Sequence, residues 1–139
     1  MTNATLTTID TASEGKLVRT LHIIYGLHAL GLAIGAFGAA SVLGSFLFGW
    51  PSIIAVIVSY IYRGDARGTW LESHFGWAIR TFWWALAIAA IVLLLSLPLM
   101  VVLVGFLTLP VGFVLLGVWA IYRIARGWLR LNGRQPMPV

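Results

Sequence analysis

Apolar residues along this chain form two long blocks on either side of one charged segment. The first block covers residues 17–62 and carries no charge beyond Arg19, and the second covers residues 81–122 and carries none. A membrane-spanning helix needs about 20 predominantly apolar residues, so each block is long enough for two spans. The first break is expected near residues 41–45. The pattern predicts four spans, over residues 17–40, 46–62, 81–100 and 101–122.

The charged segment between the blocks contains the start of a helix. Thr69 and Glu72 have the spacing of a capping box, in which each side chain accepts a hydrogen bond from the other end of the first turn. On a helix that begins there, Trp70, His74 and Trp77 fall on one stripe, at offsets of four and three. We therefore predict an interfacial helix over residues 69–80 that merges into the third span.

A second amphipathic segment follows the last span. Arg123, Arg126 and Arg130 recur there at offsets of three and four, with Ile124 and Trp128 between them. This pattern is typical of a helix that lies at a membrane surface with a basic face. We predict an interfacial helix over residues 123–131.

The positions of the basic residues predict the topology. All nine Lys and Arg residues flank apolar blocks, and the first and third predicted loops contain none. With four spans, the three basic regions share one side, which the positive-inside rule makes cytoplasmic. A signal peptide is the competing interpretation of the first span, but its apolar run is too long and contains His22 and His28. We expect a polar flexible tail over residues 1–15, one transmembrane domain over 16–131, and a short tail over 132–139.

Composition supports a membrane protein. Hydrophobic residues make up 60% of the 139 residues, charged residues make up 9%, and the mean hydropathy is +0.97. A soluble domain is typically near half apolar and a quarter charged. The predicted fold class is therefore an all-α integral membrane four-helix bundle with both termini cytoplasmic. We interpret the net charge of +5 as contacts with anionic lipid headgroups, not with nucleic acid.

Two sets of residues, a glycine motif and the histidines, each allow a structural and a functional interpretation. Gly31 and Gly35 form a GxxxG motif, which predicts close helix packing within the bundle or against a second copy or partner. Histidines in a span suggest haem, a metal or a proton relay. His22 and His28 are six residues apart, about 240° around a helix, so a site would require one of them to meet His74. We interpret all three as structural or interfacial, and we predict no cofactor or metal.

The acids outside the N-terminal tail do not form a recognisable catalytic set. Asp65 and Glu72 could be combined with His74 into a cluster, but local contacts at a capped helix start explain the same pattern. The chain has no cysteine, no nucleophile elbow, no phosphate-binding loop and no HExxH motif. We therefore expect that this protein is not an enzyme.

Two runs, SHFGWAIRTFWW in the middle of the chain and YRIARGWLRLN near its end, resemble small uncharacterised bacterial inner-membrane proteins. The resemblance covers roughly residues 18–138. That family is distantly similar to the four-helix Tic translocon component of the chloroplast inner envelope. Positions 76 and 78 tend to be Arg and Gln in the family and are Gly76 and Ala78 here. The resemblance implies a four-helix protein of the bacterial cytoplasmic membrane and, more distantly, a part in protein translocation.

The leading hypothesis is a non-enzymatic accessory or scaffold subunit of the inner membrane. It presents a cytoplasmic aromatic and basic face to lipid and to a membrane protein partner or a second copy. The alternatives are a component of a translocation or transport conduit, and a haem- or quinone-binding protein. The candidate face consists of Trp70, His74, Trp77, Arg80, Arg123, Arg126 and Arg130.

Overall fold

The computed structural model describes residues 11–38 and 49–138, and within them the chain is helical with no strand. The predicted all-α class is therefore confirmed for the part that the structure describes. The predicted break at residues 41–45 lies outside it. The elements are α1 (Thr11–Gly38), α3 (Trp50–Arg63), α4 (Trp70–Leu99), the 3-10 helix η1 (Met100–Val102) and α5 (Gly105–Asn132).

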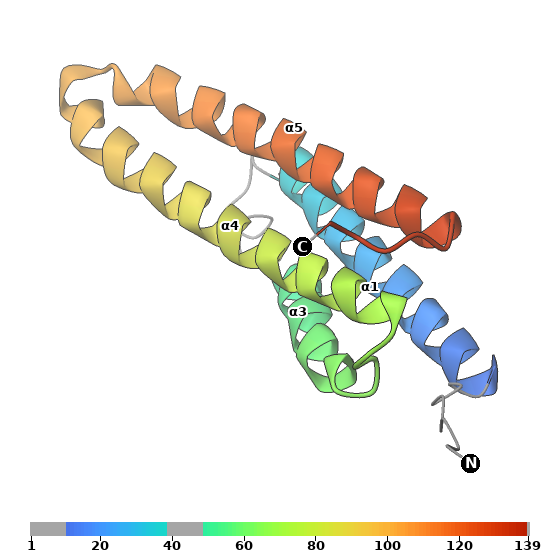
Figure 1. Ribbon diagram of the computed structural model, residues 1–139. Helices are drawn as coiled ribbons and strands as arrows, with labels where there is room; N and C mark the ends of the chain where they lie inside the picture. The colour runs from blue at the N-terminus through green and yellow to red at the C-terminus, as the bar shows by residue number, and fades with distance from the viewer. Residues whose placement is uncertain (1–10, 39–48, 139) are drawn as a thin grey trace, which may run out of the picture.

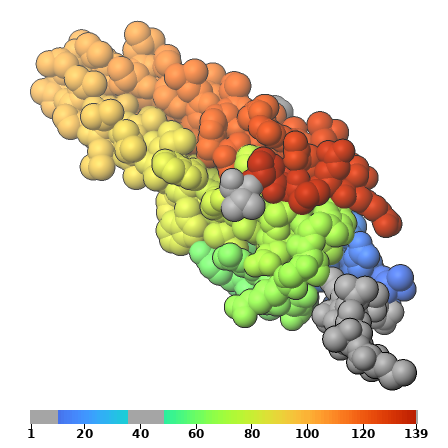
Figure 2. All heavy atoms as spheres, viewed as in Figure 1, coloured from blue at the N-terminus to red at the C-terminus, as the bar shows by residue number. Residues whose placement is uncertain are grey.

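Helices α4 and α5 form a long antiparallel hairpin, and α1 and α3 pack beside one half of it (Figure 1). The most extensive contact is between α4 and α5, followed by the contact between α1 and α3. Figure 2 shows the yellow-to-orange part of the hairpin projecting beyond the blue and green elements. The bundle is therefore four helices thick at one end and two at the other.

The thick end gathers the basic regions of the chain. There the Lys16 ammonium lies 6.0 Å from the centre of the Tyr62 ring, which joins the start of α1 to the end of α3. The Trp70 indole donates to the Glu14 carboxylate at 3.1 Å, and the Trp128 indole donates to His22 Nδ1 at 2.9 Å. The starts of α1 and α4 and the ends of α3 and α5 thus lie together, and we call this the basic end.

Most of the hydrophobic core also lies at the basic end. The core joins α1, α4 and α5 to the segment that follows α5, and its largest fully buried side chains include Tyr25 and Phe75. The hairpin beyond it is exposed on its outer faces: Leu94 is 71% exposed and Leu107 is 69% exposed. Its apolar surface therefore faces the surroundings of the protein.

Within residues 11–38 and 49–138, three helices are long and apolar enough to cross a membrane. They cover Thr11–Gly35, Trp70–Val102 and Gly105–Asn132. Helix α3 has 14 residues, about 21 Å at 1.5 Å per residue, against a hydrocarbon core of about 30 Å. It begins at Trp50 with Pro51 in its first turn, as expected for a proline that has no N–H to leave unpaired.

The helix start predicted at Thr69 is confirmed, with one difference. Thr69 Oγ1 accepts a hydrogen bond from the Leu71 N–H at 3.2 Å, as an N-cap does. Glu72 Oε2 accepts from the Gly68 N–H at 3.0 Å, one residue earlier than a capping box requires. The reason is that the Thr69 N–H is already bonded to the Ala66 carbonyl.

The structure corrects two predicted boundaries. Helix α1 begins at Thr11, so residues 11–15 are helical and not a flexible tail; Glu14 is fixed there by its hydrogen bond from Trp70. Helix α5 runs unbroken through 123–131, which was predicted as a helix beyond the fourth span, whereas the continuity of α4 from 69–80 into the apolar run agrees with the prediction. These segments are the first turns of α4 and the last turns of α5, because nothing in the sequence between them and the apolar runs breaks a helix.

Candidate functional site

His74, predicted to lie on an accessible face, is fully buried at the basic end. Its Nε2 lies 2.8 Å from the Gln135 carbonyl oxygen, and its Nδ1 lies 3.1 Å from the Tyr25 hydroxyl. A carbonyl can only accept, so the neutral ring donates from Nε2 and accepts at Nδ1 from Tyr25. Both nitrogens of His74 therefore form hydrogen bonds to other segments of the chain, which indicates a structural role.

Trp70 and Arg130, also predicted on this face, have internal partners as well. The Trp70 indole is bonded to Glu14, and its ring stands edge-on to His74 with ring centres 5.6 Å apart. Arg130 Nη1 donates to the Pro136 carbonyl at 2.9 Å. These three residues of the predicted face thus take part in contacts within the chain.

The segment after α5, predicted to be a short tail, closes over His74. We call residues 133–138 the C-terminal clasp. The Met137 N–H donates to Ser73 Oγ at 2.9 Å, and the Met137 side chain is only 3% exposed. In Figure 1 the clasp turns back from the end of α5 across α4. The contacts of the clasp, with Gln135 on His74, explain why that histidine is sealed from the surface.

The other four residues of the predicted face lie together at the basic end, with Trp77 buried and Arg80 exposed. The Trp77 indole donates to the Arg123 carbonyl at 3.1 Å, and the Arg123 guanidinium carbon lies 3.7 Å from the centre of the Trp77 ring. Arg123 Nε also donates to Thr81 Oγ1 at 3.0 Å. We call Trp77, Arg80, Arg123 and Arg126 the arginine–tryptophan cluster.

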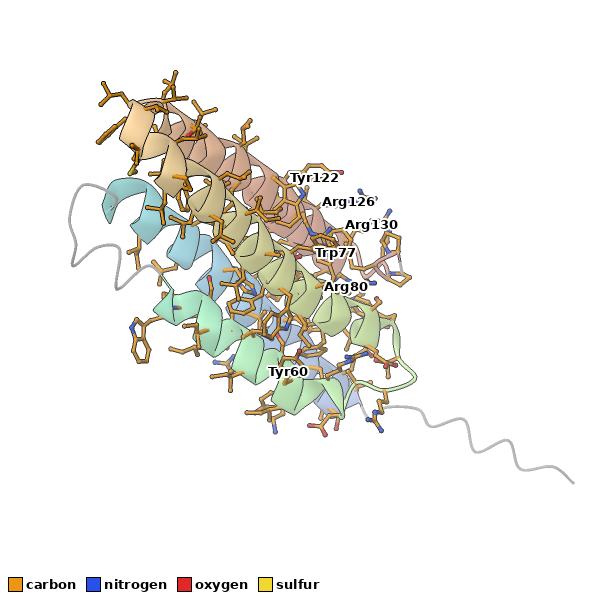
Figure 3. The ribbon with its side chains drawn as sticks, turned by 90° about the vertical axis from the view of Figure 1, so that its left-hand side faces the viewer. Tyr60, Trp77, Arg80, Tyr122, Arg126 and Arg130 are labelled. Carbon is orange, nitrogen blue, oxygen red and sulfur yellow. The ribbon has the colours of Figure 1, made fainter. Side chains whose placement is uncertain are left out.

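The two flanking arginines of this cluster are held differently. Arg126 donates to the Tyr122 hydroxyl at 2.9 Å and lies 5.9 Å from the Trp77 ring centre. Arg80 is exposed, and none of the described side chains or carbonyls accepts a hydrogen bond from it. Figure 3 shows Trp77 and Arg80 on α4 beside Tyr122 and Arg126 on α5. A hollow of about 280 Å³ opens at the cluster; it is lined by Trp77, Arg80, Trp84, Arg123 and Pro138.

A second hollow, of about 440 Å³, lies over the turn between α3 and α4. Its lining combines the basic residues Arg63 and Arg67 with the acid Glu72, which also caps α4. Glu72 offsets part of the positive charge of the two arginines at this hollow. The arginine–tryptophan cluster differs because, among the residues that the structure describes, no acid lines its hollow.

The predicted packing motif lies on α1, which contacts α3, α4 and α5. Gly31 is buried and Gly35 is half-buried. A closer helix approach that the sequence did not single out involves Gly127 of α5: a Cβ built there would lie 2.6 Å from the Tyr25 ring. Its signal would have been a glycine within an otherwise bulky basic helix.

The remaining histidines lie apart on α1. His22 accepts from Trp128, whereas His28 is buried and its Nε2 has no hydrogen-bond partner among the described residues. In residues 11–38 and 49–138, no three His, Asp or Glu side chains come together as metal ligands would.

Comparison with family models, with curated proteins and with solved structures found no match for this chain. Evidence on the function therefore comes from the geometry of the basic end. Its outer surface offers cationic and aromatic groups, and its interior is tied by hydrogen bonds between distant segments.

Proposed function

We propose that this protein is a non-enzymatic accessory or scaffold subunit of the bacterial inner membrane, with both termini in the cytoplasm. Its apolar hairpin lies in the bilayer, and its basic end presents the arginine–tryptophan cluster to lipid and to a protein partner. The observation that carries the proposal is the division of the molecule into a bare apolar hairpin and a densely bonded, positively charged end.

The topology follows from where the basic regions lie. Because the start of α1, the end of α3, the start of α4 and the end of α5 meet at one end, their arginines and lysines face one side together. The positive-inside rule makes that side cytoplasmic. Helix α3 then returns the chain across the membrane as a short fourth crossing. The resemblance to four-helix bacterial inner-membrane proteins supports the same topology.

A water-filled conduit through one copy is less well supported. Polar side chains within the apolar lengths are few, and two of the contacts they make lie inside the chain: Ser59 Oγ donates to the Ala55 carbonyl at 2.7 Å, and Thr108 Oγ1 donates to Ser96 Oγ at 3.1 Å. Neither pair offers a row of groups along a path. A translocation role would therefore need further copies or another subunit to complete the path.

The topology can be tested by single-cysteine labelling, since the chain has no cysteine of its own. We expect Arg67→Cys and Asn132→Cys to react with a membrane-impermeant maleimide in inverted vesicles but not in intact spheroplasts. Val101→Cys, at the far turn and 87% exposed, should show the opposite pattern. Labelling of Arg67→Cys and Asn132→Cys from opposite sides would contradict the four-crossing topology.

The scaffold role is tested by gentle purification with native lipids, followed by mass spectrometry of what remains bound in fixed ratio. We expect a stoichiometric protein partner that is lost from Arg80→Glu and Arg126→Glu. Arg67→Glu makes the same charge reversal in the turn between α3 and α4, and it is the matched control. A pure homo-oligomer with no other protein would contradict the accessory role and make flux through liposomes the next measurement.

A further inference from the structure

The arginine–tryptophan cluster brings positive charges together without neutralising them. The ionic neighbours that act on Arg123 are Arg80 and Arg126, which carry the same sign. Two of the acids that the structure describes have partners elsewhere: Glu14 is bonded to Trp70, and Glu72 is bonded to the Gly68 N–H. Like charges gathered in this way repel one another, and an anion bound between them relieves the repulsion.

Arg123 is fixed in advance in an orientation that suits an anion. Its guanidinium lies over the Trp77 ring, and its Nε is bonded to Thr81, so its remaining N–H groups are held in place. A planar guanidinium with two parallel N–H donors matches the oxygens of a phosphate. Because the donor is held before binding, little side-chain freedom is lost when an anion arrives.

Arg80 supplies the exposed half of the site. It is exposed, it lines the hollow with Arg123, and no described residue accepts a hydrogen bond from it. The hollow of about 280 Å³ is large enough for a phosphate group with a small substituent. Trp77 and Trp84 form its aromatic wall, and Pro138 of the clasp borders it. Tryptophan is the residue typical of the headgroup level of a bilayer.

We propose that Arg80 and Arg123, with Arg126 beside them, form a binding site for a phosphate group at the hollow next to Trp77. The phosphate comes from the headgroup of an anionic phospholipid or from soluble phosphate, and the chemistry of recognition is shared. The site deepens the lipid contact of the proposed function, and it rests on that proposal only for the lipid as the source.

The test uses the purified full-length protein in nanodiscs of phosphatidylcholine, with or without phosphatidylglycerol. Native mass spectrometry measures how many phosphatidylglycerol molecules stay bound. A lipid site predicts selective retention by the wild type and about tenfold weaker retention by Arg80→Gln, since one charge-assisted contact is lost. Arg67→Gln, an exposed arginine of the other hollow, should retain lipid like the wild type.

The soluble source is measured in the same nanodiscs without phosphatidylglycerol. If millimolar inorganic phosphate, but not equal ionic strength of chloride, raises the unfolding temperature of the wild type and not of Arg80→Gln, then soluble phosphate is the ligand. Oleate, an anionic lipid without phosphate, separates phosphate recognition from general charge. Arg123→Lys keeps the charge but loses the planar fork, and it should weaken retention as Arg80→Gln does.

Equal loss of retention in Arg80→Gln and Arg67→Gln would overturn the site, because it would indicate general surface charge. Retention of oleate as strong as that of phosphatidylglycerol would overturn it as well, as would no retention or thermal shift with either phosphate source. These failures would leave the accessory function standing when the labelling pattern and the stoichiometric partner are still found. If no stoichiometric partner is found but phosphatidylglycerol is still retained, the phosphate site stands and the accessory function fails.

Discussion

The basic end and the distal part of the α4–α5 hairpin are built from the same helices but are stabilised in different ways. At the basic end, indole, imidazole and guanidinium groups bond across elements far apart in sequence, as in the contacts of Trp77 with Arg123 and of His74 with Gln135. Along the distal hairpin, leucines point outward and a single described side-chain pair, Thr108 with Ser96, links α4 to α5.

The two regions are held together by different kinds of contact. In lipid, burying an apolar side chain between helices gains little free energy, because the lipid tails are apolar too. Helices there associate through close packing and hydrogen bonds. The hairpin relies on close packing at small residues: Gly105 lies against the Ser96 carbonyl, and a Cβ at Gly112 would lie 2.6 Å from Val92 Cγ1. The basic end relies on directional bonds, which specify which residues meet.

Replacing His74 with alanine should have the largest effect. The change removes both hydrogen bonds of a fully buried ring, leaves Tyr25 Oη without its partner, and opens a cavity. We expect the free energy of unfolding to fall by about 2–4 kcal/mol. Leu94→Ala on the exposed hairpin should change it by less than about 0.5 kcal/mol. Denaturant unfolding in detergent measures both, and equal losses would abolish the distinction between the two regions.

Gly127→Ala tests the closest helix approach at the basic end. The added methyl group would overlap the Tyr25 ring, so we expect a loss of about 1–3 kcal/mol in the free energy of unfolding. Gly117→Ala is the matched control on the same helix, because nothing lies within 4 Å of its added Cβ. It should be neutral or stabilising by up to about 1 kcal/mol. Thermal unfolding followed by circular dichroism compares them, and a stable Gly127→Ala protein would contradict the tight contact.

Gly112→Ala asks whether the hairpin is also specifically packed. The new methyl group would meet Val92, and we expect a loss of about 1–2 kcal/mol in the free energy of unfolding. The double variant Gly112→Ala with Val92→Ala makes room for it and should recover most of that loss. Recovery would show coupling between the two positions. If the single variant is as stable as the wild type, the two hairpin helices are held by their turn alone.

Thr69→Ala should have the smallest effect, about 1 kcal/mol, because it removes the N-cap of α4 and one local hydrogen bond, from Thr69 Oγ1 to the Ala66 carbonyl. Thr20→Ala is the control: Thr20 lies within α1 and its hydroxyl donates to the Lys16 carbonyl of its own helix. That control should change the free energy of unfolding by less than about 0.5 kcal/mol. Hydrogen exchange at the first turn of α4 should quicken in Thr69→Ala alone. Unchanged exchange would mean that Glu72 suffices as a cap.

Features that depend on neighbouring residues were predictable from the sequence. The start of α4 at Thr69 follows from a cap within one turn, and the turn after α4 follows from the lengths of the two predicted spans, 81–100 and 101–122. Leu103 turns the chain there with a φ of 63°. The all-helical class follows from the length of the apolar blocks.

The contacts of Trp70, His74 and Arg130 with distant or terminal segments could not be predicted in the same way. His74 is sealed by Gln135, 61 residues away, and Trp70 is bonded to Glu14, 56 residues away. A helical stripe shows which residues share a face, but it does not show which segment covers that face. The clasp, a short polar run with two prolines, gave no pattern to mark it as part of the core.

The unbroken length of α4 has a mechanical consequence. Thirty residues extend about 45 Å, whereas the hydrocarbon core is about 30 Å thick, so one stiff rod reaches from the far turn to the arginine–tryptophan cluster. A helix longer than the bilayer tilts as the bilayer thins. Because α4 is one continuous helix, a change of its tilt in a bilayer would move the arginine–tryptophan cluster as well. The orientation of the cluster at the membrane surface would therefore depend on the thickness of the membrane.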